Sequence, residues 1–155
     1  CEVLSQRLQP YRQGNGQTWQ ALIAVAASPS AGPNVDLVAT GFMTQKALKI
    51  RERLAARGVA IGVVDVFNLR DPDEGRFREA LRGVQTVVTL EEGFPHRGGL
   101  DTLVRTLLDG TGTRIKPRGF AERYTFEIGP REFLHAANGL DEASLEAFIL
   151  RPLAT

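Results

Sequence analysis

From residue 35 onward, apolar and polar positions along the chain alternate between two periodicities. Short runs that are almost entirely apolar predict strands buried on both faces, at residues 35–40, 60–67 and 84–90, with a shorter candidate at 113–116. Between them, apolar residues recur three and four positions apart, which is typical of amphipathic helices. The clearest such set is Leu100, Leu103, Val104, Leu107 and Leu108. This alternation predicts βαβ units and a mainly parallel sheet covered by helices on both faces.

Capping residues indicate where the helices begin and end. Starts are predicted where a side chain can accept from free backbone N–H groups or a proline can open a first turn: Thr44, Asp71 with Pro72, Gly129 with Pro130, and Asp141. The matching ends are Gly58, Gly83 and Pro152.

The first part of the chain does not show this alternation of strand and helix patterns. Residues 1–18 are polar and irregular, so we expect a connecting segment there and one domain over residues 19–155. A further strand is predicted at residues 19–26, followed by a loop rich in proline and glycine. The chain starts at Cys1 rather than at methionine, so we expect a piece of a longer polypeptide or one whose leading residues are missing.

The amino-acid composition limits the classes of function that we expect. The 155 residues are 43% hydrophobic and 24% charged, which suits one soluble domain. A net charge of +1 and an aromatic content of 7% give no reason to expect nucleic acid or a membrane as partner. No apolar run approaches the roughly 18 residues of a membrane span. The single cysteine excludes an intramolecular disulfide and a cysteine-rich metal site, and we expect a cytoplasmic protein.

In sheets of this kind, ligands bind beyond the carboxyl ends of the strands. The loop from Thr40 to Thr44 leads into a helix N-terminus, where free N–H groups could hold an anion. We therefore take as candidate anion-binding residues Thr40, Gly41, Thr44 and, from a later basic cluster, Arg118. A capped helix without a ligand is the simpler explanation of the loop. Acidic residues interleave with the basic cluster, which favours a solvated or subunit-facing surface there.

The loop after the strand at 84–90 is the most informative. Adjacent strand residues point to opposite faces, so Glu91 and Glu92 cannot act as an acid/base pair on one substrate. The Gly98–Gly99 pair allows the backbone to pass close to another loop or chain. We interpret this segment as an interdomain or interface loop, with direct ligand contact as the alternative. Its candidate residues are Glu92, Gly93, His96, Gly98 and Gly99.

The two histidines, His96 and His135, are interpreted as surface or interface side chains. Their separation is not a metal-binding signature, and nothing in the sequence pairs either with a nucleophile. No catalytic and no metal-binding residue is therefore predicted.

Several segments, taken in order, resemble the C-terminal domain of the transketolase family. The similarity runs from about Val35 to Ile149. Its segments are Asp36–Gly41; Val63–Asp65 with Asp71–Glu74; Val87–Gly93 with Gly98–Leu100; and Arg118–Tyr124 with Gly129–Leu134 and Gly139–Asp141. Asp101 stands where the family usually has glycine, and Tyr124 where phenylalanine is common.

The resemblance implies a three-layer α/β/α domain with a mainly parallel five-stranded sheet, in which the strand at 19–26 is antiparallel. The family includes transketolases, deoxyxylulose-phosphate synthases and the beta subunits of 2-oxoacid dehydrogenases. In the complete enzyme, thiamine diphosphate and Mg are expected between a pyrophosphate-binding and a pyrimidine-binding domain. The resemblance therefore implies a structural and dimer-contact domain of a homodimeric enzyme that transfers ketol or acyl units, with no cofactor bound by this domain alone and no activity in isolation.

Two alternatives stay open from the residues. One is an independent flavodoxin-like module that binds an anion or nucleotide at the strand ends. The other is a domain that docks a further subunit of a 2-oxoacid dehydrogenase complex.

Overall fold

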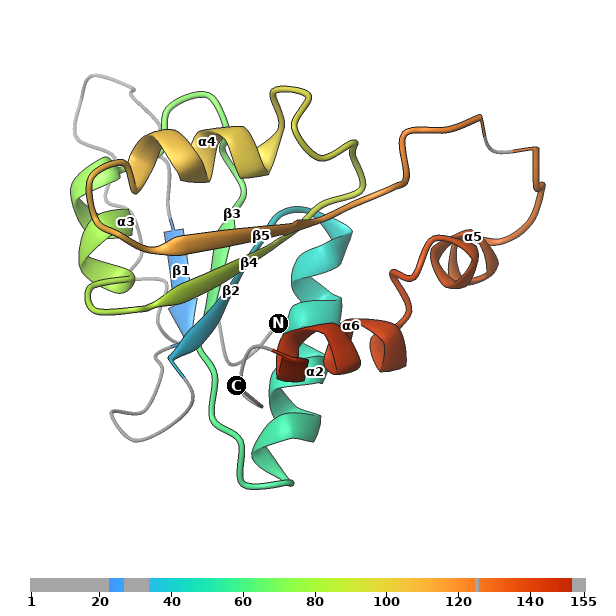
Figure 1. Cartoon of the computed structure of the whole chain (residues 1–155), viewed down its shortest axis with the longest axis horizontal. Helices are drawn as coiled ribbons and strands as arrows, with labels where there is room; N and C mark the ends of the chain where they lie inside the picture. Colours follow the sequence, from blue (N-terminus) through green and yellow to red (C-terminus); the bar gives the residue numbers. More distant parts are fainter. Residues whose placement is uncertain (1–22, 27–33, 125, 152–155) are drawn as a thin grey trace, which may run out of the picture.

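A computed structural model describes residues 23–26, 34–124 and 126–151 of the chain. Four parallel strands lie side by side in the order β3, β2, β4 and β5, with bounds Val63–Val66, Val35–Ala39, Thr86–Leu90 and Arg114–Arg118 (Figure 1). Strand β1, Ile23–Ala26, pairs with the free edge of β3 in the antiparallel direction. The parallel sheet flanked by helices confirms the predicted α/β class. Residues 1–22, which include the predicted connecting segment, lie outside the described residues.

Helices cover both faces of the sheet. On one face lie α2, Phe42–Ala55, and α6, Glu142–Leu150. On the other lie α3, Glu74–Ala80, and α4, Leu100–Leu107. The helix α5, Arg131–Ala137, follows a long segment that leaves the sheet after β5 (Figure 1).

The strands divide their side chains between two apolar cores. Leu37 of β2 and Val88 of β4 belong to the core under α2 and α6. Their neighbours Val38 and Val87 belong to the core under α3 and α4. This is the two-residue periodicity of a strand buried on both faces, and it explains why these strands are almost continuously apolar.

The starts of α2 and α3 differ from the predicted ones. Helix α2 begins at Phe42 with Gly41 as N-cap, so Thr44 is not the cap. Thr44 lies inside the first turn, and its hydroxyl donates instead to a neighbouring strand residue, as described below.

In α3, the cap is Asp73 rather than Asp71, because Asp73 precedes the first helical residue and its carboxylate can accept from Arg76 N at 2.9 Å. Asp141 is confirmed as the N-cap of α6, where it accepts from Ser144 N at 3.0 Å.

Helix α6 completes the first core. Leu145 and Ile149 are fully buried in the same cluster as Ile50 of α2. At the rim, Arg53 of α2 bonds Glu142 at 2.8 Å and Glu146 at 2.7 Å. Apolar burial contributes most of this contact, since exposed ion pairs add little to stability.

Leu145→Ala is expected to lower the free energy of unfolding by about 2–5 kcal/mol, because it removes buried methyl groups and leaves a cavity. Urea denaturation of the two proteins measures the difference. The exposed Ala147→Ser on the same helix should change it by less than about 0.5 kcal/mol. Equal effects of the two substitutions would contradict the burial of α6.

Candidate functional site at the carboxyl end of the sheet

The carboxyl ends of β2, β4 and β5 meet at one edge of the sheet, where ligand sites lie in this type of fold. Backbone bonds continue past the strands there. Thr40 N donates to Leu90 O at 3.3 Å, and Glu91 N donates to Arg118 O at 3.1 Å. The loop from Glu91 to Gly99, predicted as an interface loop, therefore leaves the sheet from a fixed position between β2 and β5.

Glu91 turns into the protein and holds the start of α4. Its side chain is buried, and its carboxylate accepts from Leu100 N at 3.1 Å and from Asp101 N at 3.4 Å. These are free N–H groups at the positive end of a helix, the kind of position that binds phosphate or other anions. Gly99 passes so close to Oε2 of Glu91 that a side chain at this position would overlap with it. An internal carboxylate thus occupies the anion position at this helix.

Asp101, which stands where the resembled family usually has glycine, has a structural role in this loop. Its carboxylate is fully buried and accepts from His96 N at 3.1 and 3.2 Å. His96 has a φ of 67°, the left-handed conformation that side chains rarely adopt, and its Nδ1 lies 3.3 Å from Asp101 Oδ2. Asp101 therefore stabilises an unfavourable turn in the loop. Both the backbone N–H and the ring of His96 contact Asp101 of the same domain.

Glu92, which like Glu91 follows the last residue of β4, has different partners from Glu91. Its Oε1 lies 2.9 Å from Arg131 Nε and 2.8 Å from His135 Nε2, both on α5. This predicted interface residue therefore anchors α5 to the end of β4, with a side chain that remains 29% exposed.

The interpretation of His135 as a surface or interface side chain is wrong. The residue is fully buried, between the rings of Phe42 and Phe120 at centroid distances of 5.9 and 5.7 Å. Its Nδ1 lies 2.6 Å from Nζ of buried Lys46. The tautomer of the ring decides which of its nitrogens donates in the contacts to Lys46 and Glu92.

Lys46 is the residue that sequence reasoning missed most completely. It also donates to Leu140 O at 2.9 Å, and burial lowers the pKa of its amino group against the opposing field of nearby acids such as Glu142. One signal was available, since Lys46 lies four residues before Ile50 on the buried side of α2. Nothing in the sequence, however, marks a lysine at such a position as buried rather than exposed at its tip.

Two of the four candidate anion-binding residues, Thr44 and Arg118, contact different partners. Thr44 donates its hydroxyl to Asp65 Oδ1 at 2.7 Å. Burial raises the pKa of Asp65, an effect that the bond from Thr44 opposes. Arg118 instead lies over the ring of Phe148, with Cζ 3.6 Å from the centroid. Burial, and to a lesser extent the nearby charge of Arg151, lowers the pKa of Arg118.

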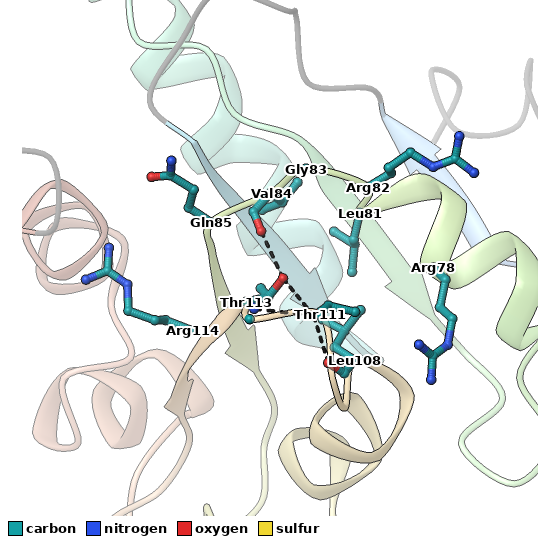
Figure 2. Close-up of a pocket in the computed structure, with 11 residues that line it drawn as sticks. Arg78, Leu81, Arg82, Gly83, Val84, Gln85, Leu108, Thr111, Thr113 and Arg114 are labelled. Carbon is teal, nitrogen blue, oxygen red and sulfur yellow. Dashed lines mark hydrogen bonds between the residues drawn. The ribbon is translucent and has the colours of Figure 1, made fainter.

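A cavity of about 590 Å³ lies at the opposite, amino end of β4 (Figure 2). Hydrogen bonds join the loops that line it, since Thr113 donates to Val84 O at 2.9 Å and Thr111 donates to Leu108 O at 2.7 Å. The side chains of Arg82 and Arg114 at its rim point away from each other in Figure 2. The lining offers no converging charged groups, so this cavity is a weaker candidate than the carboxyl edge.

Across the part of the chain that the structure describes, no group of three or more histidine, cysteine and acidic side chains could hold a metal ion. The same residues contain no helix with the length and apolar character needed to cross a bilayer.

The fold and this edge define a class: a parallel α/β domain in which carboxylates at the carboxyl edge of the sheet contact the domain's own helices. Residues 25–145 match the family described as the transketolase C-terminal domain. The chain belongs to this family.

Similarity to individual proteins supports the same family. The chain is 32% identical, over 126 residues, to 1-deoxy-D-xylulose-5-phosphate synthase of Chlamydia pneumoniae, covering 81% of this chain and 19% of the relative. It is 34% identical over 67 residues to a mitochondrial pyruvate dehydrogenase E1 component subunit beta-1 of Arabidopsis thaliana, covering 43% of this chain and 18% of that one. A solved structure described as a split gene transketolase, inactive beta4 tetramer, is similar with a TM-score of 0.68 and 30% identity, over 80% of this chain and 40% of that one. The chain thus spans about a fifth of the length of these two curated relatives.

Glu91→Ala is expected to destabilise the domain by about 1–3 kcal/mol, because it leaves two buried N–H groups at the start of α4 without an acceptor. Urea denaturation measures the loss. The matched control is Glu79→Ala, which removes an exposed ion pair with Arg82 and should cost under about 0.5 kcal/mol. A cost for Glu91→Ala no larger than that of the control would refute its role at the helix.

Asp65→Asn tests the half-buried carboxyl beside Thr44. The pKa of Asp65 is raised above 3.8 in the folded state, so its stabilising contribution is present at low pH and is lost as pH rises through the raised value. Asparagine keeps an acceptor for Thr44 but does not ionise. The stability of the variant relative to the native protein should therefore increase from acid to neutral pH, as measured by unfolding at several pH values.

The exposed Asp109→Asn serves as the reference for this series. A stability difference between Asp65→Asn and the native protein that does not change with pH would exclude burial of the charge as its cause.

Proposed function

We propose that this chain is the C-terminal structural and contact domain of a thiamine diphosphate-dependent, transketolase-like enzyme, and that it has no catalytic role alone. The observation that carries the proposal is the state of the sheet's carboxyl edge. Glu91 fills the start of α4, and Glu92 is held by Arg131 and His135. The groups that would bind or activate a substrate at this edge already bind one another.

The length of the relatives supports the same proposal. Because the chain spans about a fifth of the synthase that it resembles, most of such an enzyme lies outside it. We propose that this remainder contains the pyrophosphate- and pyrimidine-binding domains that hold thiamine diphosphate and Mg. The cofactor would supply the chemistry of ketol or acyl transfer in the whole enzyme. The engaged carboxyl edge does not fit a cofactor site in this domain.

The proposal extends to assembly and fold. We expect a homodimer of the complete enzyme in the cytoplasm, to which this domain contributes contacts through its loop Glu91–Gly99. The solved relative is described as a split gene transketolase in an inactive beta4 tetramer, so a chain similar to this one occurs in an assembly of chains. We also propose that the three-layer domain keeps β1 as its fifth, antiparallel strand in the complete enzyme.

The rival anion-binding module is less well supported, because Thr44 is engaged by Asp65 while Arg118 lies on Phe148. No specific observation favours the docking of another dehydrogenase subunit.

Calorimetry with thiamine diphosphate and Mg is the direct test. The isolated chain is expected to give no binding heat, whereas the complete enzyme that contains it should bind the cofactor. Micromolar binding by the isolated chain would contradict the non-catalytic assignment. A complete protein that does not bind thiamine diphosphate would contradict the family of reactions proposed here.

A further inference from the structure

The buried contact between Lys46 and His135 has the arrangement of an activated nucleophile. Nζ of Lys46 lies 2.6 Å from Nδ1 of His135, and Nε2 of the same ring lies 2.8 Å from Oε1 of Glu92. An amine, an imidazole and a carboxylate thus follow one another at hydrogen-bond distances. A nucleophile beside a base that a third group orients is the geometric signature of covalent chemistry in proteins.

Three separate elements hold these groups in place. Lys46 lies on the buried side of α2, Glu92 follows β4, and His135 is the residue that α5 buries. The ring of His135 packs between Phe42 and Phe120, which fixes its orientation. The fold therefore sets the position of the imidazole relative to the amine.

The amine of Lys46 keeps one position open. Its nitrogen is bonded to Cε and can make three further contacts. Two of these are the contact with His135 and the donation to Leu140 O at 2.9 Å, and the described residues supply no third hydrogen-bond or ion-pair partner. Burial lowers the pKa of Lys46 despite the opposing field of nearby acids, which increases the fraction of neutral amine at neutral pH.

A cavity of about 350 Å³ borders this lysine. It lies between α2 and the starts of α5 and α6, and its size is in the range of small-molecule sites. Lys46 lines it together with Lys49, Glu132, Asp141 and Glu142. Three carboxylates against one further ammonium favour an uncharged ligand over an anionic one.

We propose that Lys46 is a covalent binding site for a small uncharged aldehyde or ketone that enters this cavity, with His135 as the base that accepts the proton of the amine. Glu92 is a positioning residue, because it contacts the imidazole and not the amine. The site goes beyond the structural role proposed for the domain and does not depend on thiamine diphosphate.

The reaction needs no further reactant. In the tautomer that carries its proton on Nε2, Nδ1 of His135 takes a proton from the Lys46 ammonium. The lone pair of Nζ then forms a bond to the carbonyl carbon, and the carbonyl oxygen receives the proton back from His135 and becomes a hydroxyl. A second proton passes from Nζ through His135 to this hydroxyl, which leaves as water. One ammonium and one carbonyl compound thus give one protonated imine and one water, with no change in oxidation state.

Competitive labelling of the lysines tests this site directly. The chain contains three lysines, Lys46, Lys49 and Lys116. Lys49 is the matched control, because it lines the same cavity from the same helix, but its amine lies 3.8 Å from Glu142 and its side chain is 65% exposed. The full chain is treated at pH 7 with acetaldehyde and sodium cyanoborohydride, which reduces an imine to a stable secondary amine, and the peptides are quantified by mass spectrometry.

Lys46 is expected to be labelled about tenfold or more faster than Lys49, because only Lys46 has a base at hydrogen-bond distance. Exposure alone predicts the opposite order. Labelling of Lys46 at the rate of Lys49 or below it would overturn the proposal.

Substitutions separate the base from the effect of burial. His135→Gln should slow the labelling of Lys46 by about tenfold or more and leave that of Lys49 unchanged. Glu92→Gln keeps an acceptor for the ring and should slow it less. The control is the exposed Ala136→Ser on α5, which should change neither rate. A native rate at Lys46 in His135→Gln would remove the proposed base.

The pH dependence of labelling in the native chain decides the question even if His135→Gln does not fold. The pKa of Lys46 is lowered, so its neutral amine forms at a lower pH. Labelling of Lys46 should therefore reach half of its maximum at a lower pH than labelling of Lys49. Coincident profiles for the two lysines would contradict an activated amine.

The class of ligand is tested with pyruvate, an anionic ketone, under the same conditions. Lys46 should react more slowly with pyruvate than with acetaldehyde, relative to the rates at Lys49, because carboxylates line the cavity. Faster relative labelling by pyruvate would overturn the choice of an uncharged ligand. Thiamine diphosphate calorimetry bears on the proposed function alone, so the two proposals can fail independently.

Discussion

Two adjacent carboxylates at the end of β4 organise the functional edge of this domain. Glu91 and Glu92 directly follow the last residue of β4 and contact different helices. Glu91 satisfies the start of α4 on one side, and Glu92 holds α5 on the other. The edge where related folds bind ligands is thereby converted into an anchor for two helices. The loop Glu91–Gly99 also bonds the chain after β5, where Phe120 N donates to Gly93 O at 2.8 Å.

The strands and helices could be predicted because they depend on periodicity, which is a local property. Leu37 and Val88 lie in one core, and their chain neighbours Val38 and Val87 lie in the other. The apolar runs of the sequence already indicate strands that are buried on both faces in this way. Helix starts were less predictable, since both Asp71 and Asp73 can cap a helix and only the geometry of the chain selects between them. The same ambiguity made Thr44 a plausible cap, although its hydroxyl finds Asp65 on a neighbouring strand.

The site was harder to predict, because its contacts join residues far apart in the chain. Glu91 and Glu92 are predicted not to act as a pair, and in the structure they have different partners. Lys46 and His135 are 89 residues apart, and no local pattern announces that one will be buried against the other. Arg118 differs from these two residues, because its positive charge suggests a bound anion whereas its side chain lies on the ring of Phe148. Anion binding by Thr40, Gly41, Thr44 and Arg118 thus stays a prediction, and Thr44 and Arg118 do not contact a common group.

Helix α6 has a consequence for how the chain folds during its synthesis. Leu140, Leu145 and Ile149 complete a core whose other members begin at Val35. While residues 140–149 are still inside the ribosome, the apolar side chains of this core that they would cover remain exposed to water and to other nascent chains. Residue 149 must therefore be translated and released before this core can close, and a truncation before residue 140 would leave part of the core exposed rather than a slightly shortened domain.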